Sequence, residues 1–179
     1  MVQVLGVRIF GFAGWSGSGK TTLIEGVIPC LTGRRLKVSL IKHAHHRFEV
    51  DQPGKDSYRH REAGCTEVLI TSGTRWALMH ELRGEPELSL EAAVLRLSPC
   101  DLLLIEGYKA FPIPKIEVWR PAIGKPLLHA VDPHILAIAT DLPERLPAAS
   151  HALVRLPLDD YEAIATFVVD HAVEWPLPR

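Results

Sequence analysis

Residues 14–21, Gly14-Trp15-Ser16-Gly17-Ser18-Gly19-Lys20-Thr21, match the phosphate-binding pattern G-x-x-x-x-G-K-[ST] at every fixed position. Glycines in such a loop let the backbone turn tightly and point successive N–H groups at phosphate oxygens. The lysine reaches the outer phosphates as a point charge, and the threonine hydroxyl lies where it would ligate a Mg²⁺ bound to them. The segment therefore predicts a binding site for a nucleoside triphosphate.

The flanking sequence has the order that this loop requires. The apolar run Val7 to Phe12 predicts a buried strand, and Thr21 to Leu31 predicts a helix that has one apolar face and is closed by Gly33. The positive end of the helix dipole would then face the phosphates. The alternative is a glycine-rich turn that merely joins two elements.

Composition bounds the class of protein. The 179 residues are 47% hydrophobic and 23% charged with a formal net charge of -1, which is typical of one globular α/β domain spanning residues 1–179. No overall basic excess favours binding to nucleic acid or to a membrane surface. The absence of a long apolar run or a signal-type N-terminus predicts a cytoplasmic protein.

Strands and helices alternate along the remaining chain. Together with the phosphate loop they predict a three-layer α/β fold, the P-loop NTPase fold, with a mostly parallel mixed sheet. Ser72-Gly73-Thr74 predicts the turn of an antiparallel hairpin. Strands are predicted at 37–41, 67–71, 75–82, 102–105, 115–119, 135–140 and 153–156, and helices at 56–63, from Ser89 to about Leu97, and after a capping box of Asp159 with Glu162.

Ligands of an open α/β sheet bind outside the carboxyl ends of its strands, and this rule selects the candidate acidic residues. Glu106 follows the apolar strand 102–105 and is predicted to hold Mg²⁺ together with Thr21, directly or through water. Asp101 lies at the opposite end of that strand and is expected to support it. Asp51, in the long polar loop 42–57, is a second candidate, either beside Mg²⁺ or orienting the attacking water.

Asp141 follows the strand 135–140 and is a candidate for base recognition. A carboxylate there can accept two hydrogen bonds from N1 and N2 of guanine, a donor pair that adenine lacks, so it would select GTP over ATP. The alternative is an ordinary turn aspartate before Leu142-Pro143.

His43, His45 and His46 permit two interpretations. They could form a zinc or nickel site with Asp51 or Cys65. We favour the other, in which the imidazoles supply hydrogen bonds and positive charge to anionic ligand groups, together with the cationic side chains of Lys42, Arg47 and Lys55.

One combination of segments is distinctive: 14–21, 42–46, Asp51 with 53–57, 104–109 and 112–118. Taken together in this order, they resemble the molybdopterin-guanine dinucleotide biosynthesis protein B (MobB) family over about Val7 to Pro143. The phosphate loop alone is common to many families, whereas the combination in this order is specific. Ala44 departs from the family pattern, in which we expect an acidic residue.

The resemblance implies a homodimeric GTP-binding protein with weak intrinsic GTPase activity. It would assist the partner enzyme, a guanylyltransferase, that attaches GMP to molybdopterin, and Lys109 or the histidine-rich loop would contact the dimer groove or molybdopterin itself. The nucleotide contacts that carry over are Gly17, Ser18, Gly19, Lys20, Thr21 and Thr22, beside Gly14 of the loop pattern, with Glu106 on the magnesium side.

Two other functions use the same loop. A small-molecule kinase would grip its phosphate acceptor with the 42–57 loop, and a binding module would hold nucleotide without hydrolysing it. For the GTPase, in-line attack of water on the γ-phosphate would use Lys20, the loop amides, Mg²⁺, Glu106 and Asp51, and turnover would be slow because no arginine finger is evident.

Overall fold

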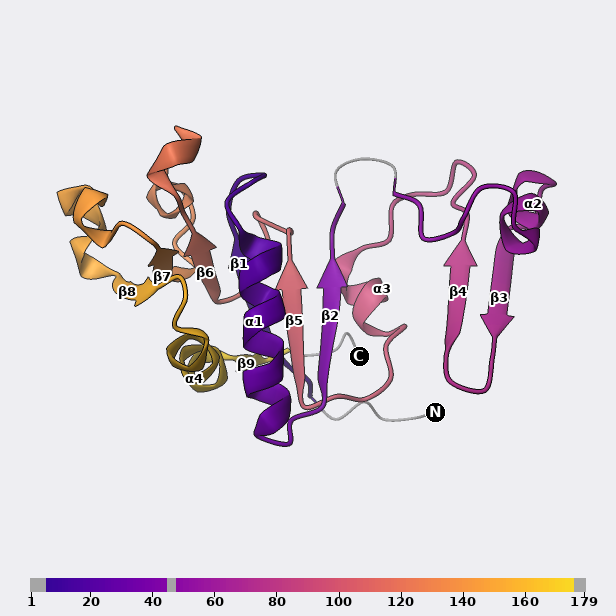
Figure 1. Ribbon diagram of the computed structural model, residues 1–179, viewed down its shortest axis with the longest axis horizontal. Helices are drawn as coiled ribbons and strands as arrows, with labels where there is room; N and C mark the ends of the chain where they lie inside the picture. Colours follow the sequence, from indigo (N-terminus) through magenta and orange to yellow (C-terminus); the bar gives the residue numbers. More distant parts are fainter. Residues whose placement is uncertain (1–5, 45–47, 176–179) are drawn as a thin grey trace. The chain divides into compact units, whose positions relative to one another are not determined.

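The computed structural model describes residues 6–44 and 48–175 (Figure 1). The chain divides into two compact units: unit 1 comprises Met1–His43 and Ala93–Arg179, and unit 2 comprises Ala44–Ala92. A single domain over residues 1–179 stays a prediction.

Unit 1 is built on a sheet with the strand order β2-β5-β1-β6-β7-β8, in which all neighbours are parallel. A short last strand pairs antiparallel with β1, so the predicted mostly parallel mixed sheet is confirmed. The strands are β1 (Arg8–Ala13), β2 (Val38–Lys42), β5 (Leu102–Glu106), β6 (Lys115–Val118), β7 (Ile135–Thr140), β8 (Val154–Pro157) and β9 (Val173–Glu174).

The register of this sheet aligns the carboxyl ends of its central strands. Glu106 at the end of β5 pairs with Phe12 of β1 on one side and with Lys42 of β2 on the other. On the opposite side of β1, Ala13 pairs with Glu117 of β6. Whatever follows these strands is therefore presented at one edge of the sheet.

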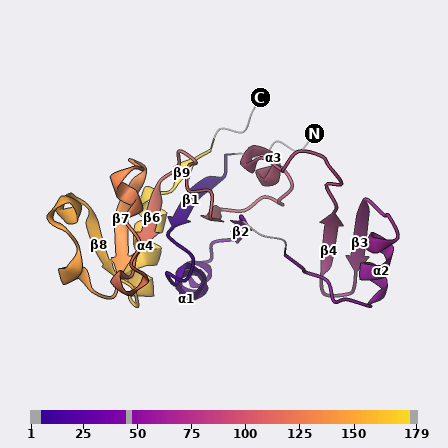
Figure 2. The same cartoon turned by 90° about the horizontal axis from the view of Figure 1, so that it is seen from above.

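Two helices, α1 (Lys20–Gly33) and α4 (Tyr161–His171), cover one face of the sheet (Figures 1 and 2). They pack closely at Gly26, where a Cβ atom would lie 2.6 Å from the ring of Tyr161. The core beneath them is aliphatic and aromatic, and its fully buried members include Phe10, Phe12, Leu23, Val27, Leu31, Leu102, Leu104, Ile116, Ala137, Ala139, Ile164 and Val168.

Connecting segments cover the other face. Ile113 packs on Gly11 of β1, and Glu117 of β6 accepts hydrogen bonds from the backbone N–H groups of Leu128 and His129 at 2.7 and 3.0 Å. Burial on both faces matches the continuous apolar runs of parallel strands. The short 3-10 helices in the connections of unit 1 are η1 (Pro121–Ile123), η2 (Leu128–Ala130), η3 (Pro143–Arg145) and η4 (Ala148–Ala152).

Unit 2 contains the predicted hairpin, with β3 (Glu67–Thr71) antiparallel to β4 (Trp76–His80), and a short helix α2 (Asp56–Glu62) beside β3. A further helix, α3 (Leu90–Val94), begins in the residues of unit 2 and ends in those of unit 1. The hairpin prediction is thereby confirmed.

Most predicted element ends differ from the observed ones by one or two residues, and three helix ends are instructive. Helix α1 includes Gly33, and the left-handed residue that follows it is Arg35, with φ of 64°. Helix α3 ends at Val94, short of the predicted Leu97, and the chain continues in turns in which the Leu97 N–H donates to the Val94 carbonyl oxygen at 3.2 Å. Asp160, not Asp159, caps α4, since its carboxylate accepts a hydrogen bond from the Ala163 N–H at 3.0 Å.

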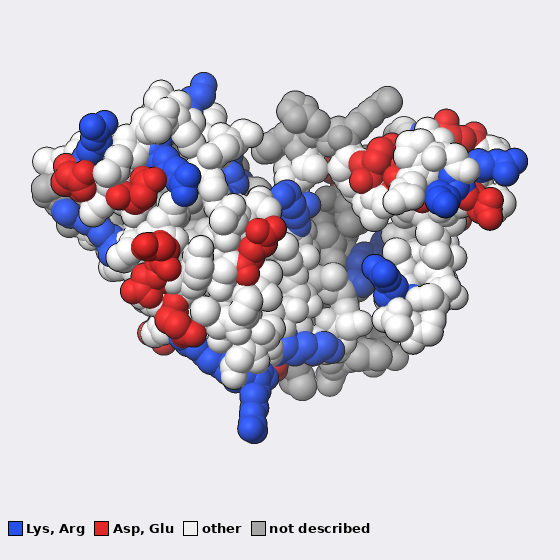
Figure 3. Space-filling model, in the orientation of Figure 1, with Lys and Arg blue, Asp and Glu red and all other residues white. Residues whose placement is uncertain are grey.

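None of the helices in residues 6–44 and 48–175 combines the length and the apolar character needed to cross a membrane. On the face of unit 1 drawn in Figure 3, basic and acidic side chains are interspersed.

Candidate nucleotide-binding site

The phosphate loop joins β1 to α1 and depends on glycine backbone geometry. Gly14, Gly17 and Gly19 have φ values of 148°, 80° and 92°, in the region that disfavours other residues. A Cβ on Gly14 would lie 2.6 Å from the carbonyl oxygen of Val118, so a side chain there would collide with β6. The loop therefore has the curled form that the sequence predicts.

Helix α1 begins at this loop with its N-terminus available to an anion. Gly19 is the N-cap residue; among the described residues no side chain caps this end, and the first turn has no acidic side chain. The N–H groups of Lys20, Thr21 and Thr22 thus lack the partners that a helix start normally needs. A phosphate group satisfies both these donors and the helix dipole.

The Lys20 side chain folds over the loop. Its Nζ donates hydrogen bonds to the carbonyl oxygens of Gly14 and Trp15 at 3.0 and 2.9 Å. Partial burial lowers the pKa of Lys20, the positive charges of Lys109 and Lys42 lower it further, and Glu106 opposes the shift. Because lysine charges gather here, an anionic ligand would relieve their mutual repulsion.

Thr21, Glu106 and Lys42 form a triangle at the carboxyl ends of β5 and β2. The Thr21 hydroxyl donates to Glu106 Oε1 at 3.1 Å, and Lys42 Nζ lies 3.3 Å from both Thr21 Oγ1 and Glu106 Oε2. Glu106 is only 5% exposed, which argues against a solvated turn acid. An ammonium group thus lies against the two oxygens that the sequence assigns to a metal ion.

This triangle fits Mg²⁺. The ion prefers oxygen ligands, takes one or two carboxylates and shares phosphate oxygens. Thr21 and Glu106 provide a hydroxyl and a carboxylate, and the Lys42 ammonium shows that the pair already accommodates a cation. Bound there, Mg²⁺ would neutralise charge on the outer phosphates.

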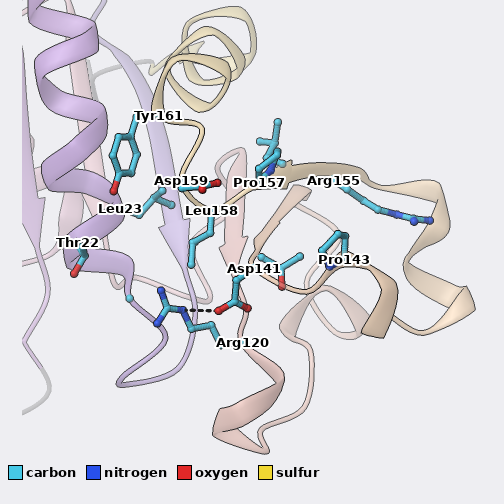
Figure 4. Close-up of a pocket in the computed structure, with 13 residues that line it drawn as sticks. Thr22, Leu23, Arg120, Asp141, Pro143, Arg155, Pro157, Leu158, Asp159 and Tyr161 are labelled. Atoms are coloured by element: carbon cyan, nitrogen blue, oxygen red, sulfur yellow. Dashed lines mark ion pairs between the residues drawn. The ribbon is translucent and has the colours of Figure 1, made fainter.

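A pocket of about 450 Å³ adjoins the phosphate loop in unit 1 (Figure 4). Gly19 and Thr22 line it beside the loop, and Asp141 lines it beyond β7. Its other lining residues come from the first turn of α1, the segment after β6, the end of β7 with the start of η3, strand β8, and the segment that leads into α4: Leu23, Arg120, Thr140, Pro143, Arg155, Leu156, Pro157, Leu158, Asp159 and Tyr161.

Asp141 is paired with Arg120, which follows β6. Arg120 Nε lies 3.5 Å from Asp141 Oδ2, and the two side chains are 41% and 46% exposed. Asp141 thus lines the same pocket as Gly19 and has an arginine side chain against its carboxylate.

Trp15 of the loop is held by the connection that follows β6. Its Nε1 donates to the carbonyl oxygen of Pro126 at 2.7 Å. The ammonium groups of Lys109 and Lys125 lie 4.3 and 5.7 Å from the centroid of its ring. These contacts fix the outer wall of the loop and place Lys109 at its rim.

Asp51 lies in unit 2. Its Oδ1 accepts hydrogen bonds from Ser57 Oγ at 2.7 Å and from the Gln52 N–H at 3.0 Å, and its Oδ2 lies 3.5 Å from Arg61 Nε. Arg61 is also paired with Glu49 and Glu81. These contacts organise the loop before α2, and the predicted catalytic role of Asp51 stays a prediction.

Of the three histidines, His43 lies directly after β2, where its ring is 4.9 Å from that of Tyr108. His45 and His46 lie outside the described residues. Within 6–44 and 48–175, no three His, Cys, Asp or Glu side chains form a group that could hold a metal ion.

Asp101, just before β5, accepts a hydrogen bond from the Lys37 N–H at 2.6 Å, which fits its expected supporting role.

Sequence reasoning missed Arg120 and the contact of Lys42 with Glu106. Lys42 ends β2 and Arg120 follows β6, so the rule that selected Glu106 and Asp141 at the carboxyl ends of strands also selects these two positions. The pairings themselves depend on the strand order, which places β5 between β1 and β2.

A parallel sheet with a glycine loop between its central strand and a helix N-terminus defines a P-loop nucleotide-binding protein of the NTPase fold. Residues 9–141 match the family described as molybdopterin guanine dinucleotide synthesis protein B, MobB. The chain belongs to this family.

Relatives support the assignment. The chain is 42% identical to the molybdopterin-guanine dinucleotide biosynthesis adapter protein of Escherichia coli over 92% of its length and 93% of that protein. It is 42% identical to the adapter protein of Haemophilus influenzae over 84% of each chain. The crystal structure of Bacillus subtilis MobB superposes with a TM-score of 0.73 at 25% identity, covering 93% of this chain and 98% of that one.

Proposed function

We propose that this protein binds GTP with Mg²⁺ and hydrolyses it slowly, as an accessory protein in the conversion of molybdopterin to its guanine dinucleotide form. The observation that carries the proposal is the pocket in unit 1. The pocket runs from Gly19 and Thr22 beside the phosphate loop to Asp141, so one nucleotide can contact both ends of the pocket at once.

The phosphate end would use the groups described above. Loop amides and the N-terminus of α1 would bind the phosphates, Lys20 would neutralise the outer ones, and Thr21 with Glu106 would hold Mg²⁺. Ser18 supports this assignment: its Oγ is buried and has no hydrogen-bond partner among the described residues, which leaves it able to donate to a phosphate.

The base end would select guanine. A carboxylate accepts hydrogen bonds but does not donate them, so Asp141 matches guanine N1 and N2 and repels adenine N1. The apolar walls, such as Leu23 and Leu158, suit a planar base.

Titration of the purified protein with GTP and ATP in the presence of Mg²⁺ tests the proposal. We expect GTP to bind more tightly than ATP, and Asp141→Asn to remove most of the difference. Equal affinity of the unchanged protein for both nucleotides would contradict base selection by Asp141.

Hydrolysis is tested by phosphate release. Lys20→Ala should remove a slow GTP-dependent release that the unchanged protein shows. Equal background rates would leave a nucleotide-binding module, and phosphorylation of a small alcohol by ATP would favour a kinase instead.

The accessory role is supported by the relatives, which are named as adapter proteins for molybdopterin-guanine dinucleotide biosynthesis. We infer that the partner is the guanylyltransferase that attaches GMP to molybdopterin, and that both act in the cytoplasm. Lys109 is our candidate contact for molybdopterin itself, and co-purification of the pterin with the protein tests this role.

A homodimer is the assembly we propose, with the β3–β4 hairpin as its contact. Leu69, Trp76 and Leu78 share one face of this hairpin and are 59%, 65% and 45% exposed. A two-stranded hairpin is marginal by itself, so burying this face against a second copy would stabilise it.

The oligomeric state tests this contact. Trp76→Ser with Leu78→Lys should convert a dimer to a monomer in light scattering after size exclusion. Val131→Lys is the matched control, because Val131 is an 84% exposed apolar residue of unit 1. A monomeric unchanged protein, or a double variant that stays dimeric, would contradict the proposal.

A further inference from the structure

Arg120 holds a position between the two ends of the pocket. It follows β6, and its guanidinium lies against the phosphate loop: a Cβ built on Gly19 would be 3.6 Å from Arg120 Cζ and Nη2. The same guanidinium is directed to Asp141, as the dashed line in Figure 4 shows. Arg120 thus lies beside the backbone that would bind phosphate and is paired with the carboxylate that would bind the base.

The hydrogen bonding of Arg120 is incomplete. Its Nε is buried and makes no hydrogen bond to any described residue, because Asp141 Oδ2 is 3.5 Å away and outside hydrogen-bond geometry. A buried donor in this state is costly, whereas a ligand oxygen would satisfy it.

A nucleotide spanning the pocket must pass this guanidinium. If its outer phosphates lie in the loop and its base at Asp141, then its α-phosphate and ribose run past Gly19 and Thr22, which line the pocket together with Arg120. The planar fork of a guanidinium matches a phosphate group in shape and charge.

The ion pair between Arg120 and Asp141 is weak enough for a nucleotide to open it. Both side chains are about half exposed, and solvent-exposed ion pairs contribute little to stability. An arginine–phosphate pair beside a helix N-terminus is stronger, and guanine can replace the guanidinium as the hydrogen-bond donor to Asp141.

We infer that Arg120 binds the inner phosphates of the guanine nucleotide, and that nucleotide binding opens the Arg120–Asp141 ion pair so that guanine takes the place of the guanidinium on Asp141. This inference rests on the proposed function. It makes Arg120 a ligand-binding residue that couples recognition of the phosphates to recognition of the base.

Affinities for GDP, GMP and guanosine, measured by calorimetry or by displacement of a fluorescent GDP analogue, test the inference. Arg120→Ala should weaken GDP and GMP binding roughly 10- to 100-fold, the usual effect of losing a hydrogen bond to a charged group. Guanosine, which has no phosphate, should bind as well as before or more tightly, because Asp141 is no longer paired.

The same titrations in an Asp141→Asn background separate direct from indirect action. The loss of GDP affinity caused by Arg120→Ala should persist there if Arg120 contacts phosphate. It should disappear if Arg120 acts only by orienting Asp141, and that result would overturn the inference.

Arg34→Ala is the matched control. Arg34 forms an exposed ion pair with Glu162 at 2.7 Å, beyond the last residue of α1, so its loss should leave GDP affinity unchanged. If the unchanged protein binds no guanine nucleotide, the proposed function fails. If it binds GDP and Arg120→Ala binds GDP equally well, only the role of Arg120 fails.

Discussion

Thr21 donates a hydrogen bond to Glu106 across 3.1 Å, joining the first turn of the helix after the phosphate loop to the end of the neighbouring strand β5. The two residues are far apart in the sequence and are brought together because β5 lies beside β1 in the sheet. Their oxygens face the Lys42 ammonium, so the site holds a cation between a hydroxyl and a carboxylate.

Glu106→Gln should therefore reduce the effect of Mg²⁺ on GTP affinity. Loss of a carboxylate that contacts the metal directly or through water weakens metal binding roughly 10- to 100-fold. Calorimetric titration with GTP at increasing Mg²⁺ concentrations measures this dependence. Asp101→Asn, at the other end of β5, is the control and should keep it. A normal Mg²⁺ dependence in Glu106→Gln would remove Glu106 from the metal site.

Asp132→Asn should destabilise the fold more than Lys115→Met does. Lys115 is 2% exposed and its Nζ lies 2.9 Å from Asp132 Oδ2, so the first change leaves a buried ammonium without its counter-charge. Such a change costs about 3–5 kcal/mol. Lys115→Met leaves only a carboxylate that still contacts His134. Denaturant unfolding of both variants measures the order, and the reverse order would show that the ammonium is not the costly group.

Glu117 should make stability depend on pH. Burial raises the pKa of Glu117, and hydrogen bonds from the backbone N–H groups of Leu128 and His129 oppose the shift. Because the folded pKa is the higher one, the contribution of Glu117 is complete below the unfolded value of about 4.3 and is lost as the pH rises through the folded value. The stability of Glu117→Gln relative to the unchanged protein should therefore increase with pH across this window.

Denaturant titrations of both proteins at several pH values from about 4.5 upward give this difference. A constant offset is expected from the hydrogen bond that glutamine cannot accept. A difference that does not vary with pH would mean that the pKa of Glu117 is not raised.

Gly26→Ala should destabilise the protein although alanine favours helices. The gain in helix propensity is about 1 kcal/mol, whereas a methyl group 2.6 Å from the Tyr161 ring forces α1 and α4 apart at a cost of about 1–3 kcal/mol. Gly33→Ala is the control, since no described atom lies within 4 Å of a Cβ there. Thermal unfolding should show a lower Tm for the first variant only.

His80 in unit 2 should titrate above its usual range. Its Nδ1 lies 2.8 Å from Glu67 Oε1, and this hydrogen bond raises the pKa of His80. The stabilisation is complete below about pH 6.5, the ordinary histidine pKa, and is lost as the pH rises through the raised value. NMR titration should show a lower His80 pKa in Glu67→Gln. Identical titration curves would exclude the pair in solution.

The sequence alone determined the fold class and the phosphate end of the site. The conformation of residues 14–21 depends on the segment itself, because its glycines permit positive φ and its lysine lies at a fixed offset from which it reaches the loop. Glu106 and Asp141 could be selected because residues at the carboxyl ends of parallel strands share one edge of the sheet.

Only the tertiary structure decided which of these side chains meet. Lys42 contacts Glu106 because β2 lies next to β5, and Arg120 pairs with Asp141 because β6 lies next to β7. The spacing of residues along the chain does not reveal that these strands are neighbours, since strand order follows from packing of the whole core. The choice of Asp160 over Asp159 as the cap of α4 likewise depends on backbone geometry, which the sequence of two neighbouring aspartates does not determine.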